Sequence, residues 1–446
     1  MVNEWREVRL GEIAEIIMGQ SPPGETYNHS GEGLPFFQGV ADFGYRHPTP
    51  RVYCTAPSRI AYPGDILLSV RAPIGRVNVV DKECSIGRGL SIVRPRHSAD
   101  ARYIEFVLRY LEPQWHKIEG GGSVFGNATR DDLERLHIPW FESESDRCAI
   151  AHILGTLDDK IELNRRMSQT LEEMAQALFK AWFVDFEPVR AKMEGRWRRG
   201  ESLPGLPGTG GFGTGEFETR PYPYADLFPD RLVDSELGEI PEGWRVGHFG
   251  DVVEHLRGQE NPLSSPQTLY QHFSIPAFDE GQCPKTEYGE AIRSQKWHVP
   301  PGVVLLSKLN PEIERVWLVD VCPGEHAVCS TEFLVLRARS PFTRSFVYCL
   351  ARSPLFRQQL QSLVTGTSKS HQRAQVESIL SLATLVPPPH VVMAFDRLAE
   401  SLLTRALDCR RESRTLATLR DTLLPKLISG ELRVKDAERF LKERGL

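Results

Sequence analysis

The feature of this sequence that most restricts its fold is a heptad pattern that runs unbroken from about Asp146 to Pro188. Residues spaced alternately four and three positions apart are apolar with two exceptions, as in helices that pair along a seam. These residues are Ile150, Leu154, Leu157, Ile161, Asn164, Ser168, Leu171, Ala175, Leu178 and Trp182. Because no Pro or Gly occurs between Gly155 and Pro188, we predict one helix about 60 Å long. Such a helix needs a partner for its apolar face.

A second heptad pattern, 245 positions later, supplies the candidate partner. Its residues are Phe395, Ala399, Leu402, Ala406, Cys409, Ser413, Leu416, Arg420, Leu423 and Leu427. Ser413 matches Ser168, a polar position of the kind that fixes register, whereas Arg420 breaks the apolar pattern. We predict an antiparallel coiled coil; the alternative is two unrelated amphipathic helices in separate cores. The residues expected at the contact between the helices or with other subunits are Leu157, Ile161, Leu171, Leu178, Phe179, Trp182, Phe183, Leu402, Leu416, Leu423 and Leu427.

The segments before the two patterns also repeat. Trp5-Arg6 reappears as Trp244-Arg245, and Pro63-Gly64 before ILLS reappears as Pro301-Gly302 before VVLLS. An internal duplication predicts two similar domains aimed at two similar targets. We therefore expect an α+β fold in which two repeated mixed α/β domains are each followed by a long helix. The expected segments are a first domain at 1–145, a helix at 146–186, a linker at 187–241, a second domain at 242–389, a helix at 390–431 and a C-terminal tail at 432–446.

Local patterns give the expected elements of the first domain and the linker. Strands are predicted within Ile60–Val70, Gly75–Val80 and Gly89–Pro95, a helix at Ala101–Trp115 and a glycine-rich loop at Gly120–Leu133. The linker is predicted from its Gly/Pro-rich composition. Its basic start, RAKMEGRWRR, fits either a solvated linker surface or an arm that contacts DNA.

Composition excludes several classes of protein. A chain of 446 residues has room for two or three domains. No apolar run reaches membrane-spanning length, and the N-terminus has no signal-peptide pattern. Eight scattered cysteines without a CxxC pair suggest neither a zinc site nor a disulfide framework, so we expect a cytoplasmic protein.

No catalytic set is recognisable. The sequence has no GxxxxGK[ST] loop, no GxGxxG after a strand and no Asn-Pro-Pro-aromatic tetrad, and its histidines lack metal-ligand spacing. Asp158-Asp159-Lys160 resembles the end of a nuclease triad, but without a companion acid we interpret it as an exposed helix face. We expect no enzymatic activity and no metal site in this chain.

Charge distribution favours binding instead. The net charge of −5 argues against nucleic acid as a partner, but two sectors are basic. Between Phe333 and Val376 there is no acidic residue, whereas seven are basic: Arg337, Arg339, Arg344, Arg352, Arg357, Lys369 and Arg373. Between Arg46 and Arg102, ten Lys and Arg residues stand against four acids. Basic sectors in both domains are typical of DNA binding, and ordinary solvated surface is the alternative.

An aromatic group closes the first long helix. It consists of Phe179, Trp182, Phe183 and Phe186. The group fits either an exposed contact site for a partner or a cluster that packs the helix against its own domain.

Three stretches resemble a known family, the specificity subunits of type I restriction-modification systems. They are ALFKAWFVDFEPVRAKMEG after the first helix, LVDSELGEIPEGWRV before the second domain, and LRDTLLPKLISGELRV at the end of the second helix. With the duplicated layout, the resemblance covers essentially the whole chain. After Pro387-Pro388-Pro389 the chain reads HVVMAF, where the family has a Glu-Gln pair.

The resemblance implies a function in DNA recognition without catalysis. Two target-recognition domains would each read one half of a split, asymmetric sequence in double-stranded DNA. The paired helices would act as a spacer and dock two methyltransferase subunits, to which restriction subunits add. S-adenosylmethionine, ATP and Mg²⁺ would belong to those partner subunits and no cofactor to this chain. A scaffold that joins two protein-binding domains is the alternative, and the missing motifs argue against a self-contained nuclease or methyltransferase.

Loop position and side-chain chemistry give the candidate DNA contacts, because basic and amide side chains in loops donate to phosphates and read base edges. In the first domain they are Gln20, Ser21, Arg71, Arg76, Ser123, Asn127 and Arg130. In the second they are Arg257, Gln259, Lys308, Thr367, Ser368, Lys369, His371 and Arg373.

Overall fold

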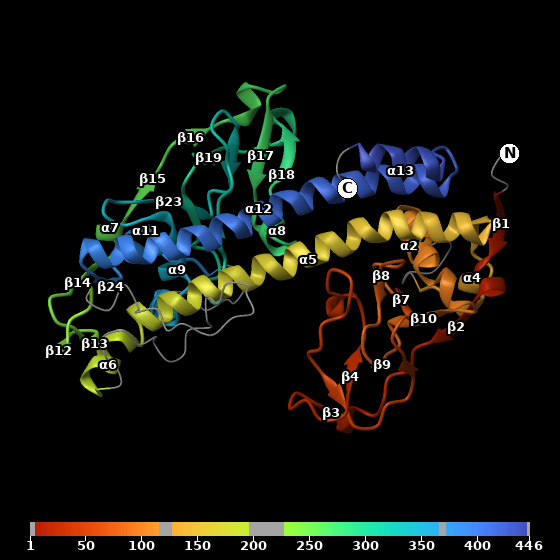
Figure 1. Ribbon diagram of the computed structural model, residues 1–446, viewed down its shortest axis with the longest axis horizontal. Coiled ribbons are helices and arrows are strands. Elements are labelled where there is room, and N and C mark those ends of the chain that lie inside the picture. The colour runs from red at the N-terminus through yellow and green to blue at the C-terminus, as the bar shows by residue number, and fades with distance from the viewer. Residues whose placement is uncertain (1–4, 116–126, 196–226, 365–371, 444–446) are drawn as a thin grey trace, which may run out of the picture. The chain divides into compact units, whose positions relative to one another are not determined.

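The structure is a computed structural model that describes residues 5–115, 127–195, 227–364 and 372–443 (Figure 1). The chain divides into two compact units. Unit 1 comprises residues 1–166 and 410–446, and unit 2 comprises residues 167–409. Each of the two long helices therefore contributes one part to each unit. None of the described helices combines the length and apolar character needed to cross a membrane.

The two long helices form where the heptad patterns predict them, with shifted ends. Helix α5 spans Glu144–Phe183 and helix α12 spans Pro389–Ile428, 40 residues each. Helix α5 ends three residues before the predicted limit because Phe186 adopts a left-handed backbone, with φ of 53°. Helix α12 ends just before Gly430, whose φ of 76° closes the helix. The predicted C-terminal tail contains another helix, α13 (Val434–Lys442).

Unit 1 carries three antiparallel or mixed sheets. Strand β1 (Trp5–Arg9) pairs with β11 (His137–Phe141). A four-stranded antiparallel sheet has the order β2 (Ala14–Met18), β10 (Leu90–Pro95), β7 (Ile66–Ser69), β8 (Val77–Val79). A five-stranded sheet has the order β3 (Tyr27–Asn28), β5 (Tyr53–Cys54), β4 (Leu34–Phe37), β9 (Cys84–Ile86), β6 (Ile60–Ala61). The helices besides α5, α12 and α13 are α1 (Leu10–Ile13), α2 (Ala101–Leu111) and α4 (Arg130–Glu134), with short 3-10 turns η1 (Gly24–Thr26), η2 (Val40–Asp42), η3 (Ser98–Asp100) and η4 (Glu112–Gln114).

Two predicted elements of unit 1 differ from the structure. Helix α2 ends at Leu111 because Pro113 lies in the 3-10 turn that follows. The predicted glycine-rich loop contains helix α4 at its end. Thr129 starts α4: its side-chain oxygen accepts from the Asp132 backbone N–H at 3.2 Å, and the Asp132 carboxylate accepts from the Thr129 N–H at 2.8 Å. The Thr-x-x-Asp spacing in the sequence is typical of a helix N-terminus and could have predicted this helix.

Unit 2 repeats these sheets. Strand β14 (Arg245–His248) pairs with β24 (Ala383–Val386). The four-stranded sheet has the order β15 (Val253–Leu256), β23 (Phe333–Ala338), β20 (Val304–Ser307), β21 (Val316–Leu318). The five-stranded sheet has the order β16 (Gln259–Glu260), β19 (Lys296–His298), β22 (Ala327–Cys329), β17 (Leu269–Phe273), β18 (Lys285–Tyr288). Its helices and turns are α7 (Phe249–Val252), α8 (Ile275–Asp279), α9 (Arg344–Ala351), α10 (Pro354–Ser362), α11 (Val376–Leu380), η6 (Pro262–Ser264) and η7 (Gly289–Ala291).

The strand orders of the two units correspond. In both, an antiparallel four-stranded sheet accompanies a mixed sheet with one parallel pair, β4 with β9 in unit 1 and β17 with β22 in unit 2. The mixed sheets share four strands in the same order and differ in the fifth. Strand β3 extends one edge in unit 1, whereas β16 extends the opposite edge in unit 2.

Both ends of the segment predicted to be a linker, residues 187–241, contain regular structure that packs on unit 2. Helix α6 (Glu187–Met193) buries Val189 in the core of unit 2, and a hairpin of β12 (Leu232–Ser235) and β13 (Gly238–Pro241) buries Ile240 there. In the basic stretch after α5, Lys192 donates to the Phe228 carbonyl at 2.6 Å and pairs with Asp230 at 2.8 Å. These contacts hold Lys192 on unit 2. Residues 196–226 lie outside the described part of the chain.

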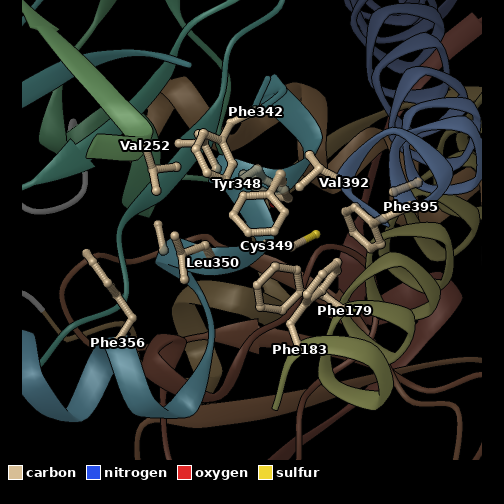
Figure 2. Close-up of a cluster of buried hydrophobic side chains, with 14 of the residues drawn as sticks. Phe179, Phe183, Val252, Phe342, Tyr348, Cys349, Leu350, Phe356, Val392 and Phe395 are labelled. Carbon is tan, nitrogen blue, oxygen red and sulfur yellow. The ribbon is translucent and has the colours of Figure 1, made fainter. Parts of the chain in front are cut away.

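The core of unit 2 contains the aromatic group of helix α5 (Figure 2). Phe179, Trp182, Phe183 and Phe186 are all buried. Phe395 of α12 lies against them, with ring centroids 5.7 Å from Phe179 and 5.3 Å from Phe183. The aromatic group therefore packs the end of α5 into the core of its own unit, as one of the two interpretations holds, and is not an exposed contact site. Of the other predicted contact residues, Leu171 and Leu402 are half-buried, and Leu157, Ile161, Leu178, Leu416, Leu423 and Leu427 are buried.

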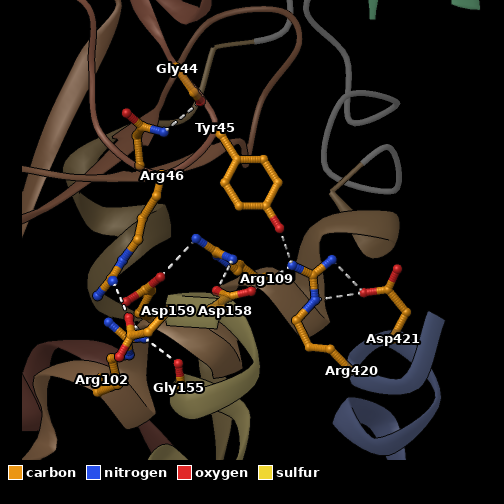
Figure 3. Close-up of polar contacts among 12 residues, drawn as sticks. Gly44, Tyr45, Arg46, Arg102, Arg109, Gly155, Asp158, Asp159, Arg420 and Asp421 are labelled. Atoms are coloured by element: carbon orange, nitrogen blue, oxygen red, sulfur yellow. Dashed lines mark hydrogen bonds and ion pairs between the residues drawn. The ribbon is translucent and has the colours of Figure 1, made fainter. Parts of the chain in front are cut away.

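The core of unit 1 contains a charged network that the sequence interpretation missed (Figure 3). Asp158 is completely buried, so its assignment to an exposed helix face is wrong. Its carboxylate pairs with Arg109 of α2 at 2.8 Å and with Arg420 of α12 at 2.6 Å. Arg420 also donates to the Tyr45 hydroxyl at 2.9 Å. Arg420, the apparent break in the second heptad pattern, is therefore the ion-pair partner of an acid on the first long helix.

Candidate nucleic-acid interface

One end of the four-stranded sheet gathers most of the candidate DNA contacts of unit 1. In the strand register Met18 lies opposite Ser91, Ser69 opposite Leu90, and Leu68 opposite Val77. Strands β2 and β7 therefore end where β10 and β8 begin. We call this region the unit 1 sheet end, formed by residues 19–21, 70–76, 87–89 and 127.

Five predicted residues lie at the unit 1 sheet end: Gln20, Ser21, Arg71, Arg76 and Asn127. Gln20 and Ser21 follow β2, and Arg71 is the second residue after β7. Asn127 lies opposite Arg71 in an isolated antiparallel bridge, and both side chains are exposed. Arg76 forms an ion pair with Glu112, which reduces its availability to a phosphate.

The other two predicted residues of unit 1 are placed differently. Arg130 begins helix α4 three positions after Asn127 and pairs with Glu134 at 2.7 Å. Ser123 lies outside the described residues.

Arg88 belongs to the unit 1 sheet end and was not among the predicted contacts. It is exposed in the turn between β9 and β10, and its backbone N–H donates to the Ser21 hydroxyl at 3.4 Å. The sequence signal was available, because a basic residue between two glycines directly precedes a predicted strand. No ion pair to Arg71 or Arg88 is found within the described ranges.

The equivalent end of the unit 2 sheet gathers Arg257, Gln259, Lys308 and Arg373. We call residues 257–259, 308–315, 330–332 and 373 the unit 2 sheet end. Arg373 lies opposite Leu309 in an isolated bridge. Gln259 is in the short strand β16 opposite Trp297, so its predicted loop position is wrong. Thr367, Ser368, Lys369 and His371 lie outside the described residues.

The acid-free stretch between Phe333 and Val376 does not form a continuous basic surface. Arg344 pairs with Glu400, and Arg352 pairs with Glu314 at 2.7 Å. Arg357 is buried and donates to the Pro311 carbonyl at 2.6 Å. The sequence count was misleading here because acids from distant parts of the chain fold onto these arginines.

At the unit 2 sheet end the exposed arginines also have carboxylate partners. Arg373 pairs with Glu332 at 2.8 Å, and Arg257 pairs with Glu377 at 3.1 Å. The two sheet ends therefore differ in charge. At the unit 1 sheet end, Arg71 and Arg88 have no carboxylate partner in the described chain. At the unit 2 sheet end, each exposed arginine is paired with a glutamate.

His255, two residues before Arg257, lies in a positive environment. Burial and the charges of Arg257 and Lys308 lower its pKa from the ordinary value, against a smaller opposing effect of Glu377. Its Nδ1 accepts from Arg257 Nε at 3.4 Å, which also favours the neutral ring.

We expect unit 2 to lose stability on acidification through this histidine. Because the pKa of His255 is lower in the folded state, the unfolded chain takes up the proton first, and stability falls as pH drops below about 6.5. Urea denaturation at pH 7.5 and pH 5.5 should show a smaller pH effect in His255→Gln than in the wild type. Exposed His298, replaced by Gln, is the control. Equal pH effects in the wild type and His255→Gln would contradict the prediction.

The described residues contain no group of three or more His, Cys, Asp or Glu side chains arranged to hold a metal ion. What the two units do offer is two similar sheet ends with Arg, Lys, Asn and Gln side chains. These features define a class of protein with a duplicated α+β fold that has an equivalent sheet end in each unit.

Comparison with known proteins gives the family. Residues 2–173 match the family described as the type I restriction modification DNA specificity domain. A candidate MjaX type I restriction enzyme specificity subunit of Methanocaldococcus jannaschii is 42% identical over 38% of this chain and 40% of its own length, so the chain matches less than half of that relative. The MjaIX specificity subunit of the same organism is 24% identical over 97% of this chain and 94% of its own.

A solved structure extends the likeness in fold. The S subunit of a type I restriction-modification system from M. genitalium has a TM-score of 0.55 and 12% identity over 95% of this chain and 96% of its own. Residues 2–173 of this chain thus match the specificity domain of type I restriction-modification systems, and over most of its length the chain is similar to a specificity subunit of such a system.

Proposed function

We propose that this chain is the DNA-specificity subunit of a type I restriction-modification complex. The observation that supports this most strongly is the recurrence of one sheet end in two units of equivalent strand order. Arginine and lysine bind phosphates, and arginine, asparagine and glutamine read base edges in the major groove. Each unit would read one half of a split, asymmetric site. The relatives' names support this assignment.

The two long helices are proposed to pair as an antiparallel coiled coil. In unit 1, residues of the first part of α5 contact the last part of α12, as in Asp158 with Arg420 and Asn164 with Glu412 at 2.8 Å. In unit 2, the last part of α5 contacts the first part of α12, as in Phe179 with Phe395. This order supports an antiparallel arrangement. The pair would set the number of unspecified base pairs between the half-sites.

The chain is proposed to act without chemistry of its own. Two methyltransferase subunits would dock on it, and restriction subunits would join through them. S-adenosylmethionine, ATP and Mg²⁺ would be bound by those partners and no cofactor by this chain. A scaffold without DNA recognition is the alternative, and DNA binding by the chain would exclude it.

Arg71 and Arg88 are expected to supply phosphate contacts in unit 1. The double variant Arg71→Ala, Arg88→Ala should weaken binding to all DNA sequences and reduce the slope of log K against log salt by about two. Lys82→Ala, in the turn at the opposite end of β8, is the matched control. Binding titrations at several salt concentrations measure both quantities. An unchanged slope in the double variant would remove these residues from the interface.

The function itself is tested by sequencing DNA methylation in a host strain with and without this gene. We expect one split motif, two short half-sites around a fixed gap, to disappear with the gene. If no motif disappears, capture of a methyltransferase subunit on the tagged chain decides whether the system is inactive or the function is wrong. Failure of both experiments would contradict the proposal.

A further inference from the structure

Asn127 and Arg373 occupy the same backbone position in the two units. Each forms an isolated antiparallel bridge just beyond a central strand, Asn127 with Arg71 after β7 and Arg373 with Leu309 after β20. The alanine that follows each residue makes the same hydrogen bond. The Ala128 N–H donates to the Val70 carbonyl at 2.9 Å, and the Ala374 N–H donates to the Lys308 carbonyl at 3.0 Å. One structural position thus carries two different polar side chains.

The guanidinium of Arg373 is held in one orientation. Its Nε donates to one carboxylate oxygen of Glu332 at 3.0 Å, and its Nη2 donates to the other at 2.8 Å. This side-on pairing leaves Nη1 and the second hydrogen of Nη2 at the far edge of the group. The side chain of Arg373 is 56% exposed, whereas that of Glu332 is only 20% exposed. The guanidinium edge that does not contact Glu332 is therefore part of the more exposed side chain. Two parallel donors at that edge match the O6 and N7 acceptors of guanine.

Unit 1 provides no counterpart of Glu332. The Lys308 N–H donates to the Glu332 carbonyl at 3.0 Å, and the Val70 N–H donates to the Gly89 carbonyl at 2.9 Å, so Gly89 is the equivalent residue. A Cβ on Gly89 would lie 2.2 Å from the Gln38 carbonyl oxygen, which excludes a carboxylate-bearing side chain. The exposed Asn127 beside it has one donor and one acceptor side by side. That pair matches N7 and the N6 amino group of adenine.

We propose that Asn127 and Arg373 are the equivalent base-reading residues of the two domains, Asn127 for an adenine and Arg373 for a guanine. Glu332 is a positioning residue that acts through Arg373. The proposal rests on the proposed function, because it assigns a role within the same DNA interface. It implies that one half-site contains an adenine and the other a guanine read from equivalent positions.

A phosphate contact by Arg373 would give a different result. Loss of a phosphate contact weakens binding to every sequence by the same factor, whereas loss of a base contact relaxes the preference at one base pair. The test therefore measures preference and total affinity separately. The full chain, expressed together with its methyltransferase subunit, selects duplexes from a randomised library, and the enriched sequences are read.

The wild type should enrich a split motif. Arg373→Ala should reduce the preference for one guanine about 10- to 100-fold and leave the other half-site unchanged. Asn127→Ala should reduce the preference for one adenine in the other half-site by a similar factor.

Arg373→Lys keeps the charge but lacks the two parallel N–H donors of a guanidinium, so the guanine preference should fall while affinity at low salt is retained. Glu332→Gln should reduce the same guanine preference less than Arg373→Ala does. Arg337→Ala, an exposed arginine near the other end of β23, is the control.

The outcomes separate this proposal from the function on which it rests. If the wild type enriches no sequence, the proposed function fails. If the wild type enriches a motif and Arg373→Lys and Asn127→Ala enrich the same one, the base-reading assignment is wrong. A uniform loss of affinity in Arg373→Ala without a changed motif would make Arg373 a phosphate contact and also overturn the assignment.

Discussion

Replacing Asp158 with asparagine is expected to lower the free energy of unfolding by about 3–5 kcal/mol, the usual cost of removing one partner from a buried ion pair. The carboxylate is completely buried, while the side chains of Arg109 and Arg420 are 16% and 15% exposed. Burial acts to lower the pKa of Arg420, but the charge of Asp158 leads the opposing effects and raises the pKa overall. Without that charge, Arg420 keeps the Tyr45 hydroxyl at 2.9 Å and the more exposed Asp421 carboxylate at 2.7 Å, but loses its buried partner in a poorly solvated site.

Asp159 provides the matched control on the same helix. Its carboxylate is 61% exposed and pairs with Arg46 at 2.6 Å and Arg102 at 2.8 Å. Because water screens such pairs, Asp159→Asn should cost less than about 1 kcal/mol. Urea denaturation of both variants at neutral pH, followed by circular dichroism, measures the difference. Equal losses in the two variants would mean that the buried network contributes no more than a surface pair.

Phe395→Ala is expected to destabilise unit 2 by about 3–5 kcal/mol through the cavity that it leaves. The ring is completely buried on α12 and packs edge-on against two aromatic rings of α5, with centroids 5.7 Å from Phe179 and 5.3 Å from Phe183. Its loss removes apolar contacts from both long helices at once. The cost should appear as a lower denaturation midpoint of the transition assigned to unit 2.

Met393, two residues earlier on α12, is the control for Phe395. Its side chain is 53% exposed, so Met393→Ala should change stability by less than about 0.5 kcal/mol. Phe395→Leu keeps most of the buried volume and should cost less than Phe395→Ala. If Phe395→Leu were as destabilising as Phe395→Ala, the edge-on ring contacts rather than buried volume would account for the loss.

The long helices were predictable because their signal is local. A heptad pattern depends on residues within two turns of each other, and nearly every predicted seam residue of α5 is buried. Their ends were less predictable, since the left-handed Phe186 that ends α5 has no sequence signature like that of glycine.

Contacts between distant segments explain what the sequence did not show. Arg352 was counted as a basic surface residue, yet it pairs with Glu172, which lies 180 positions away in the sequence. Asp158 was assigned to an exposed helix face because its partners Arg109 and Arg420 come from two other helices. A count of charges along the sequence cannot include such neighbours.

Part of the candidate interface could be predicted because loops at the end of a sheet follow from the strand pattern. Gln20, Arg71 and Arg257 were chosen as loop residues next to predicted strands, and the register brings them to equivalent sheet ends. Arg88 was missed although its turn was recognisable. The bridge that gives Asn127 and Arg373 one backbone position needed the structure, since it joins segments more than 50 residues apart.

The buried pair of Asp158 and Arg420 makes the duplication unequal. In the 245-residue repeat, the position of Arg420 corresponds to Ala175 in the first half. If the first halves of two chains associated in place of the intramolecular pair, Asp158 would face an alanine and its buried charge would have no arginine from the opposite helix. The cost of leaving that buried charge without Arg420 would favour association of each first half with the second half of its own chain. One ion pair would thereby disfavour symmetric complexes that carry the same domain twice.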